Sequence, residues 1–361
     1  MRRFFRKTTL LVAIALMVAL LAMPALAMDF GVRAILPENQ RGGESGFFDL
    51  IVYPGQRQEL LIEIANFSED EIVVLVETIT ASTSRNGQIN YTSRGILDET
   101  IKYSFEDLAT LPESYYFIPA GSAIEVPIIL TMPDGVFDGA ILGSIRVLRE
   151  ATQDERDAAG AIVNQFAHVT AVRLVQSEDA EDMAADFALG DITMELINYR
   201  ASFVANIRNT QPIIIKGATA TARIYAKSGD QAATGQPMFE HAIESLEFAP
   251  NSVFPFSFVD MEGYGIDAGD YRAVIDIGHE GRNWSFEQDF NISEEAAAVV
   301  NDGAVNQHGQ ARPDHTGSAG NSGDVSGGGS GVPIRGVVFI AIGSAVLSAI
   351  LVLLVTLTRK K

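Results

Sequence analysis

Between residues 28 and 293, apolar and polar residues alternate in short runs with a period of two. Leu60, Ile62 and Ile64 form one such run, and Phe254 to Phe258 contains another much later in the chain. Successive side chains of a strand point to opposite faces, so each run predicts a strand with one buried face. Turn residues such as Asn86-Gly87 separate the runs at a spacing typical of antiparallel β-sandwiches. We therefore predict an all-β fold.

The runs fall into two halves with the same order of strands and turns. A polar, Ala/Gly-rich stretch at residues 151–161 separates them and is predicted to be an inter-domain joint. Residues 28–150 and 162–293 would then form two tandem immunoglobulin-like β-sandwich domains. Little helix is expected, apart from one turn within Phe105–Leu111.

The two ends of the chain differ in composition from the β region between them. Residues 1–27 combine a basic start, an apolar stretch and Ala25-Leu26-Ala27, the features of a cleaved signal peptide. Residues 336–358 carry no charge and are long enough to cross a bilayer as a single transmembrane helix. The basic residues 359–361 mark the cytoplasmic side, and the Gly/Ser/Asn-rich residues 294–335 predict a flexible linker. We expect a single-pass protein of the cell membrane whose β domains lie outside the cell.

Charge and cysteine content narrow the range of functions. The net charge is −20, and seven of the 26 basic residues lie in the predicted signal peptide and basic stub, so the exported part is more acidic still. Such a surface repels phosphate and predicts no nucleic-acid partner. The chain has no cysteine, so its stability must come from core burial without disulfides, and thiol chemistry is excluded.

Catalytic and metal-binding motifs are absent from the sequence. The stretch Gly263 to Ala268 matches G-x-G-x-x-A, but a predicted strand follows it rather than a helix, which favours a β-turn over a dinucleotide site. The acidic loop 177–191 could bind calcium or could be a solvated charged loop; it lacks the D-x-[DN]-x-[DN]-G pattern. The histidines show no metal-ligand spacing. We predict no catalytic residue, no cofactor and no metal.

Two aromatic features have structural and functional interpretations. The cluster Tyr115-Tyr116-Phe117 would stack on sugar rings or on a protein partner if it were exposed, and would be core if it were buried, which we favour. The lone Trp284 alternates with Phe286 and is predicted to lie in the core.

Several motifs together resemble the WxL-interacting protein family. The first half resembles its N-terminal domain and the second half its second domain. The motifs of the first half are Phe48-Asp49-Leu50, Tyr53-Pro54-Gly55-Gln56, Asn86 to Tyr91 and Phe137 to Val147; those of the second are Phe166 to Val172, Asn206 to Asn209, Ala249 to Ser252, Ala268 to Tyr271 and Trp284. Ser144 stands where the family often has a second glycine.

The resemblance implies a Gram-positive surface protein that does not act as an enzyme. Its first domain would contact peptidoglycan, the chain would engage WxL-domain surface proteins, and its second domain would attach to a host extracellular-matrix protein. The alternative is a structural or chaperone-like envelope assembly module without glycan binding. An enzyme acting on wall polymer would need a pair of carboxylates in one cleft, and no specific pair stands out.

Five residues are candidates for ligand binding. They are polar or aromatic and lie in the turns and the aromatic cluster of the first half: Asn86, Asn90, Tyr91, Tyr116 and Asp138. Turn geometry and core packing are the competing explanation for each. Pairing of a partner's strand with an exposed sheet edge is one further route to a protein partner.

Overall fold

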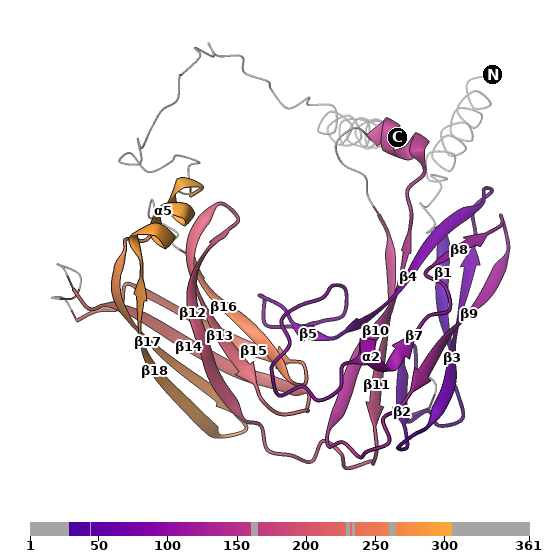
Figure 1. The fold of residues 1–361 in the computed structure, drawn as a ribbon, viewed down its shortest axis with the longest axis horizontal. Coiled ribbons are helices and arrows are strands. Elements are labelled where there is room, and N and C mark those ends of the chain that lie inside the picture. Colours follow the sequence, from indigo (N-terminus) through magenta and orange to yellow (C-terminus); the bar gives the residue numbers. More distant parts are fainter. Residues whose placement is uncertain are drawn as a thin grey trace, which may run out of the picture. The chain divides into compact units, whose positions relative to one another are not determined.

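The computed structural model describes residues 29–43, 45–159, 165–228, 232, 235–259 and 265–304. All of these lie in one compact unit of the chain. They form two β modules, each with two facing sheets (Figure 1). The predicted all-β fold is confirmed.

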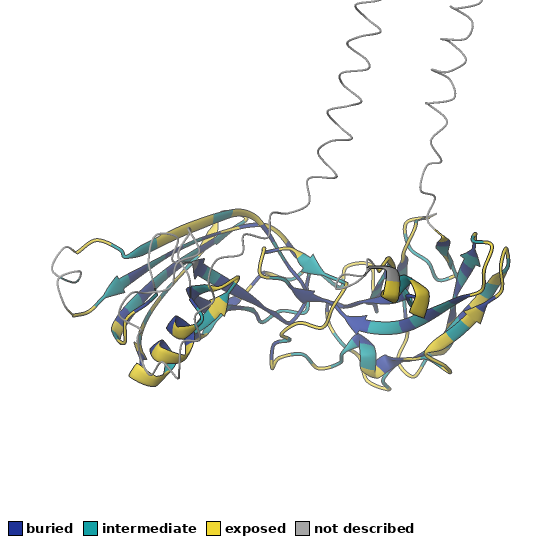
Figure 2. Cartoon of the chain, turned by 90° about the horizontal axis from the view of Figure 1, so that it is seen from above, coloured by how far each residue is buried: buried dark blue, intermediate teal, exposed yellow. Residues whose placement is uncertain are grey.

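The first module packs a four-stranded sheet against a five-stranded sheet. The four-stranded sheet has the order β1 (Phe30–Ile35), β3 (Arg57–Asn66), β9 (Ala123–Thr131) and β7 (Ala109–Thr110); the five-stranded sheet has the order β2 (Phe48–Ile51), β11 (Ala167–Val175), β10 (Ala140–Arg149), β4 (Ile72–Thr80) and β8 (Tyr115–Ile118). Alternate residues of the strands meet in one core, among them Leu60, Ile62 and Ile64 of β3, which are fully buried. The alternation of buried and exposed positions is visible along the strands in Figure 2. The single turn α2 (Phe105–Leu108) confirms the short predicted helix.

The second module has a three-stranded and a four-stranded sheet. Their orders are β12 (Phe187–Ile197), β13 (Arg200–Asn209) and β16 (Ser252–Val259), and β15 (Phe239–Phe248), β14 (Ile215–Ala226), β17 (Gly269–His279) and β18 (Arg282–Ile292). Phe254, Phe256 and Phe258 share the buried face of β16, as their spacing predicts. Trp284 is partly buried and packs edge-on against Phe187, with ring centroids 5.0 Å apart.

The stretch 151–161 is not a joint between the modules. It contains the helix α3 (Gln153–Ala159) and connects two neighbouring strands of the same sheet, because β11 pairs with β10 from Ala140↔Val175 to Leu148↔Ala167. β11 also pairs in parallel with β2. By strand pairing the first module therefore extends to Val175, beyond the domain boundary predicted at residue 151. Strand periodicity shows that a strand exists but does not show which distant strand it pairs with.

The linker predicted from residue 294 begins too early. Residues Glu294–Asp302 form the helix α5, whose N-cap Ser293 accepts a hydrogen bond from the Ala296 amide through its hydroxyl, 3.1 Å away. Ala297 and Val300 pack against the core of the second module. Asn301 is also buried and bonds both the amide and the carbonyl of Ile266. An alanine-rich stretch thus closes the second module as a helix.

The aromatic cluster is exposed rather than buried at two of its three residues. Tyr115 is 52% exposed and Phe117 is 65% exposed, whereas Tyr116 turns toward the core. The preference for a buried cluster was therefore wrong for Tyr115 and Phe117. Tyr115 and Phe117 lie on the outer face of the sheet, and the edge position of β8 leaves them without a neighbouring strand on one side.

The predicted signal peptide, the predicted linker from residue 305 onward, the segment 336–358 and the basic residues 359–361 all lie outside the described residues. Among the residues that the structure does describe, no helix has the length and apolar character needed to span a bilayer.

Candidate functional site

A hollow of about 740 Å³ lies on the outer face of the five-stranded sheet. The hairpin of β5 (Ser82–Thr83) and β6 (Ile89–Asn90) forms one side of it, and β11 forms the other. Apolar atoms come from Ile89, Tyr91, Val169 and Ala171, and polar atoms come from Ser84, Asn86, Gln88 and Thr92. The hollow therefore offers apolar surface with amide and hydroxyl groups around it.

The Asn86-Gly87 turn forms as its sequence predicts. The Ser84 amide donates to the Gln88 carbonyl and the Gly87 amide donates to the Ser84 carbonyl, both over 2.9 Å. Gly87 has φ +71°, a conformation that glycine adopts without strain. Asn86 is exposed, and its Oδ1 accepts from the Ser84 hydroxyl. Its Nδ2 amide makes no hydrogen bond within the described part of the chain and is free to meet a ligand.

Asn90 shapes the loop instead of presenting a free amide. Its Nδ2 donates to the Ser93 carbonyl over 2.8 Å, and its Oδ1 accepts from the Thr92 amide over 3.0 Å. Side-chain bonds of this kind close an Asx turn. Asn90 therefore sets the path of the chain past the hollow.

Tyr91 is half-buried in the wall of the hollow. Its ring packs against a small apolar cluster of Ala81, Leu142 and Ala249. Burial raises the pKa of the Tyr91 phenol, and the nearby Glu247 carboxylate raises it further, so the phenol stays neutral at physiological pH. The Tyr91 carbonyl accepts a 2.6 Å hydrogen bond from the Ser144 hydroxyl. Ser144 thus links the chain that follows the hairpin to β10.

The other two candidates lie elsewhere. Tyr116 is on β8 and packs against the core, and burial raises the pKa of its phenol. Asp138 is exposed in the turn before β10, next to Gly139. The structure brings Asn86, Asn90 and Tyr91 together and does not bring Tyr116 or Asp138 to them.

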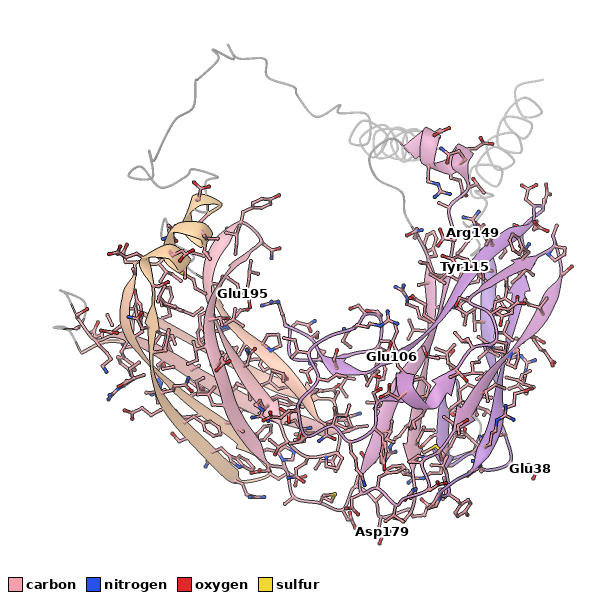
Figure 3. All side chains as sticks on the ribbon, viewed as in Figure 1. Glu38, Glu106, Tyr115, Arg149, Asp179 and Glu195 are labelled. Carbon is pink, nitrogen blue, oxygen red and sulfur yellow. The ribbon has the colours of Figure 1, made fainter. Side chains whose placement is uncertain are left out.

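The hairpin is held from its other side by the second module. The Glu247 amide donates to the Gly87 carbonyl over 2.8 Å, and the hydroxyls of Thr83 and Ser252 are 2.6 Å apart. Arg85 forms an ion pair with Glu195 on β12 over 2.6 Å (Glu195 is labelled in Figure 3). The hollow thus has one wall fixed by contacts with both modules.

A buried ion pair joins the modules close to the hairpin. Nε of Arg208 on β13 lies 2.5 Å from Oδ2 of Asp98, whose side chain is fully buried. The Asp98 Oδ1 also accepts from the Thr100 amide and hydroxyl. Asp98 and Arg208 are 110 positions apart, and no local sequence signal links them. This is the main structural feature that sequence reasoning missed.

The Asp98 carboxyl should make the join between the modules sensitive to acid. Burial alone would raise its pKa, but hydrogen bonds from Arg208 and Thr100 outweigh burial and lower the pKa below its ordinary value. A carboxyl with a lowered pKa stabilises the fold above its unfolded pKa and loses that contribution as pH falls through the folded value. We expect the urea concentration at the unfolding midpoint to decrease as the pH is lowered below about 4. The fall should be shallower in Asp98→Asn, and identical acid profiles would contradict this role.

The carboxylates of the acidic loop between β11 and β12 do not form a cluster. Glu181 forms an ion pair with Arg173 and accepts from the Ile214 amide, while Asp186 accepts from the Thr210 hydroxyl. Within the described ranges, no three histidine or carboxylate side chains are placed to hold a metal ion. The loop contains turns and no helix, and the strand β12 begins at Phe187.

Comparisons with solved structures and curated proteins are weak. The YadV chaperone is 10% identical, with 73% of this chain and 100% of that chain covered and a TM-score of 0.28. The CupB2 chaperone of Pseudomonas aeruginosa is 10% identical over 66% and 95% of the two chains, with a TM-score of 0.26. The structure of the Salmonella enterica SafA pilin in complex with the SafB chaperone is 9% identical, with 74% of this chain and 98% of that chain covered and a TM-score of 0.28. No curated protein matches the chain.

Family models give a clear result over most of the described chain. Residues 30–149 match the peptidoglycan binding domain of the WxL Interacting Protein. Residues 157–302 match the host binding domain of the same family. The second match begins before β11, although β11 belongs structurally to the first module. Both domains are described as binding domains, and the chain belongs to the WxL-interacting protein family.

Proposed function

We propose that this chain is a membrane-anchored cell-surface protein whose first module holds peptidoglycan in the hollow beside the β5–β6 hairpin. It would also engage WxL-domain proteins, and its second module would attach to a host matrix protein. The descriptions of the two matched domains support a surface binding role. The observation that carries the glycan proposal is the composition and position of the hollow within the first module.

The chemistry of the hollow suits a sugar polymer with acetamido groups. Apolar side chains such as Ile89, Val169 and Ala171 can cover the C–H faces of sugar rings, while amides and hydroxyls meet the polar groups. Arg85 is already paired with Glu195, so the polar groups are otherwise neutral. Binding through neutral hydrogen bonds and apolar contact should depend little on salt, because screening acts on charges.

Filling the hollow from its β11 wall tests the proposal. Ala171→Arg places a long side chain in the hollow, whereas Ala167→Arg adds the same charge on the same face of β11 at an exposed position outside it. We expect Ala171→Arg to reduce retention of the full-length protein on purified peptidoglycan by about tenfold, which is about 1.4 kcal/mol. Ala167→Arg should leave retention unchanged. Co-sedimentation across a concentration series measures both.

The outcomes separate the two functions under consideration. Equal retention of the two variants and the wild type would place the glycan site elsewhere. No retention of the wild type would favour the structural or chaperone-like assembly module. Intact circular dichroism spectra of both variants are the control for folding.

Membrane anchoring rests on residues 336–358, which lie outside the described residues. Their apolar length supports a spanning helix with the ectodomain outside the cell. Resistance of the membrane-bound protein to alkaline carbonate extraction would support the anchor, and release into the supernatant would contradict it.

A further inference from the structure

The edge strand β8 has backbone groups that face solvent. Among the strands that the structure describes, β8 pairs with β4 alone, from Ile72↔Ile118 to Leu75↔Tyr115. The Val76 amide donates to the Ser114 carbonyl over 2.8 Å, which sets the phase of the antiparallel ladder. Alternate residues of an edge strand direct their N–H and C=O groups away from the sheet. In β8 these residues are Tyr115 and Phe117.

The same two residues present aromatic side chains on the outer face of the sheet. Both are more than half exposed. Val73 pairs with Phe117 and Leu75 pairs with Tyr115, so partly buried apolar residues continue this face inward from the edge. Tyr115 and Arg149, both labelled in Figure 3, also line a hollow of about 340 Å³ at this end of the first module. A strand added to β8 would therefore gain apolar contact as well as hydrogen bonds.

The common protections of an edge strand are incomplete here. β8 contains no charged residue and no proline, although it is short and is flanked by Pro112 and Pro119. The two prolines limit pairing to a short segment. The edge can accept a strand of about four residues but is unsuited to long sheet-to-sheet association.

Acidic side chains surround both ends of the edge. Glu113 precedes β8, and Glu69, Asp70 and Glu71 precede β4, where Ile72 pairs with the end of β8. All four are exposed, and none forms an ion pair within the described residues. A second copy of this chain pairing antiparallel through β8 would bring these acids together, and their repulsion disfavours that arrangement. A segment with basic residues at its ends complements them.

We propose that the β8 edge binds an extended segment of a partner polypeptide, apolar at its centre and basic at its flanks, as an added strand. The segment exchanges backbone hydrogen bonds with Tyr115 and Phe117, covers their rings, and places its cations beside the four acids. This site is separate from the glycan hollow and does not depend on it.

Phe117→Pro provides a specific test because the Phe117 N–H faces the open edge. Proline removes this outward donor without removing a hydrogen bond to β4, and it is tolerated on edge strands. The matched variant Phe117→Thr loses the ring but keeps the N–H. The probe is a fluorescent nonapeptide with two lysines at each end and Val-Thr-Ile-Thr-Val between them, titrated by anisotropy against the full-length protein in mild detergent.

We expect Phe117→Pro to weaken peptide binding at least tenfold and Phe117→Thr to weaken it less. A second peptide carries N-methyl groups at the alternate central amides that would pair with β8, and it should not bind the wild type. This comparison uses only the wild-type protein, so it remains valid if Phe117→Pro fails to fold. No binding of the parent peptide, or equal binding of both peptides, would overturn the proposal.

Peptidoglycan retention distinguishes this site from the glycan hollow. Phe117→Pro should retain peptidoglycan as the wild type does, and Ala171→Arg should retain the peptide. Loss of peptidoglycan retention in a folded Phe117→Pro would assign the edge to the glycan and overturn the peptide proposal.

Discussion

Replacing Asp98 with alanine is expected to lower the free energy of unfolding by about 3–5 kcal/mol, because it leaves a partly buried guanidinium without its buried partner. Arg208 contacts both Asp98 oxygens, over 2.5 Å and 3.1 Å, and the Thr100 amide and hydroxyl would also lose their acceptor. Urea denaturation measures the effect, followed by circular dichroism and by the fluorescence of the single tryptophan, Trp284, which lies in the second module.

The neighbouring residue provides the matched control. Glu99 also forms an ion pair with Arg208, over 2.7 Å, but its side chain is 80% exposed. Exposed pairs contribute little, so Glu99→Ala should cost less than about 1 kcal/mol. Equal costs for Asp98→Ala and Glu99→Ala would show that burial at Asp98 does not stabilise the join between the modules.

Gly139→Ala is the second substitution with a large expected effect. Gly139 has φ +72°, and a Cβ there would lie 2.0 Å from the Pro212 carbonyl oxygen, a backbone atom that cannot rotate away. The Ala140 amide bonds the same oxygen over 2.7 Å. The left-handed backbone costs a residue with a Cβ about 1 kcal/mol, and the clash adds about 1–3 kcal/mol. We expect a total loss of about 2–4 kcal/mol in the free energy of unfolding, measured by urea denaturation.

Gly121→Ala isolates the backbone contribution from the clash. Gly121 has φ +62°, but a Cβ there meets no atom within 4 Å. Only the conformational cost of about 1 kcal/mol should appear. Equal losses in the free energy of unfolding for the two glycine variants would contradict the close approach of Gly139 to Pro212.

Sequence periodicity predicted strands well because the alternation of buried and exposed positions is a local property. The faces of β3 and β16 follow directly from Leu60 to Ile64 and from Phe254 to Phe258. Pairing between distant strands is not local, and so the assignment of β11 to the first module could not be read from its own residues. The helix α5 was missed because its stability depends on Ala297, Val300 and Asn301 packing against a module that the local pattern does not show.

The part of the candidate site that has a local sequence signal could be predicted, and the part that depends on distant contacts could not. The Asn86-Gly87 turn has a strong local signal, and the turn carries Asn90 and Tyr91 to the same hollow. Asp98 and Arg208 have no local signal, because the fold brings them together across the modules. Asp138 was chosen as a candidate because it lies in a turn. The structure shows that this turn needs glycine at position 139, because the backbone there comes close to Pro212.

The most direct measurement is the equilibrium retention of the full-length protein on purified peptidoglycan that has been stripped of protein and anionic polymers. We predict saturable retention that changes little between low and physiological salt, since the hollow offers neutral hydrogen-bonding and apolar groups. Absence of retention, or retention that disappears on raising the salt, would contradict glycan binding in the hollow of the first module.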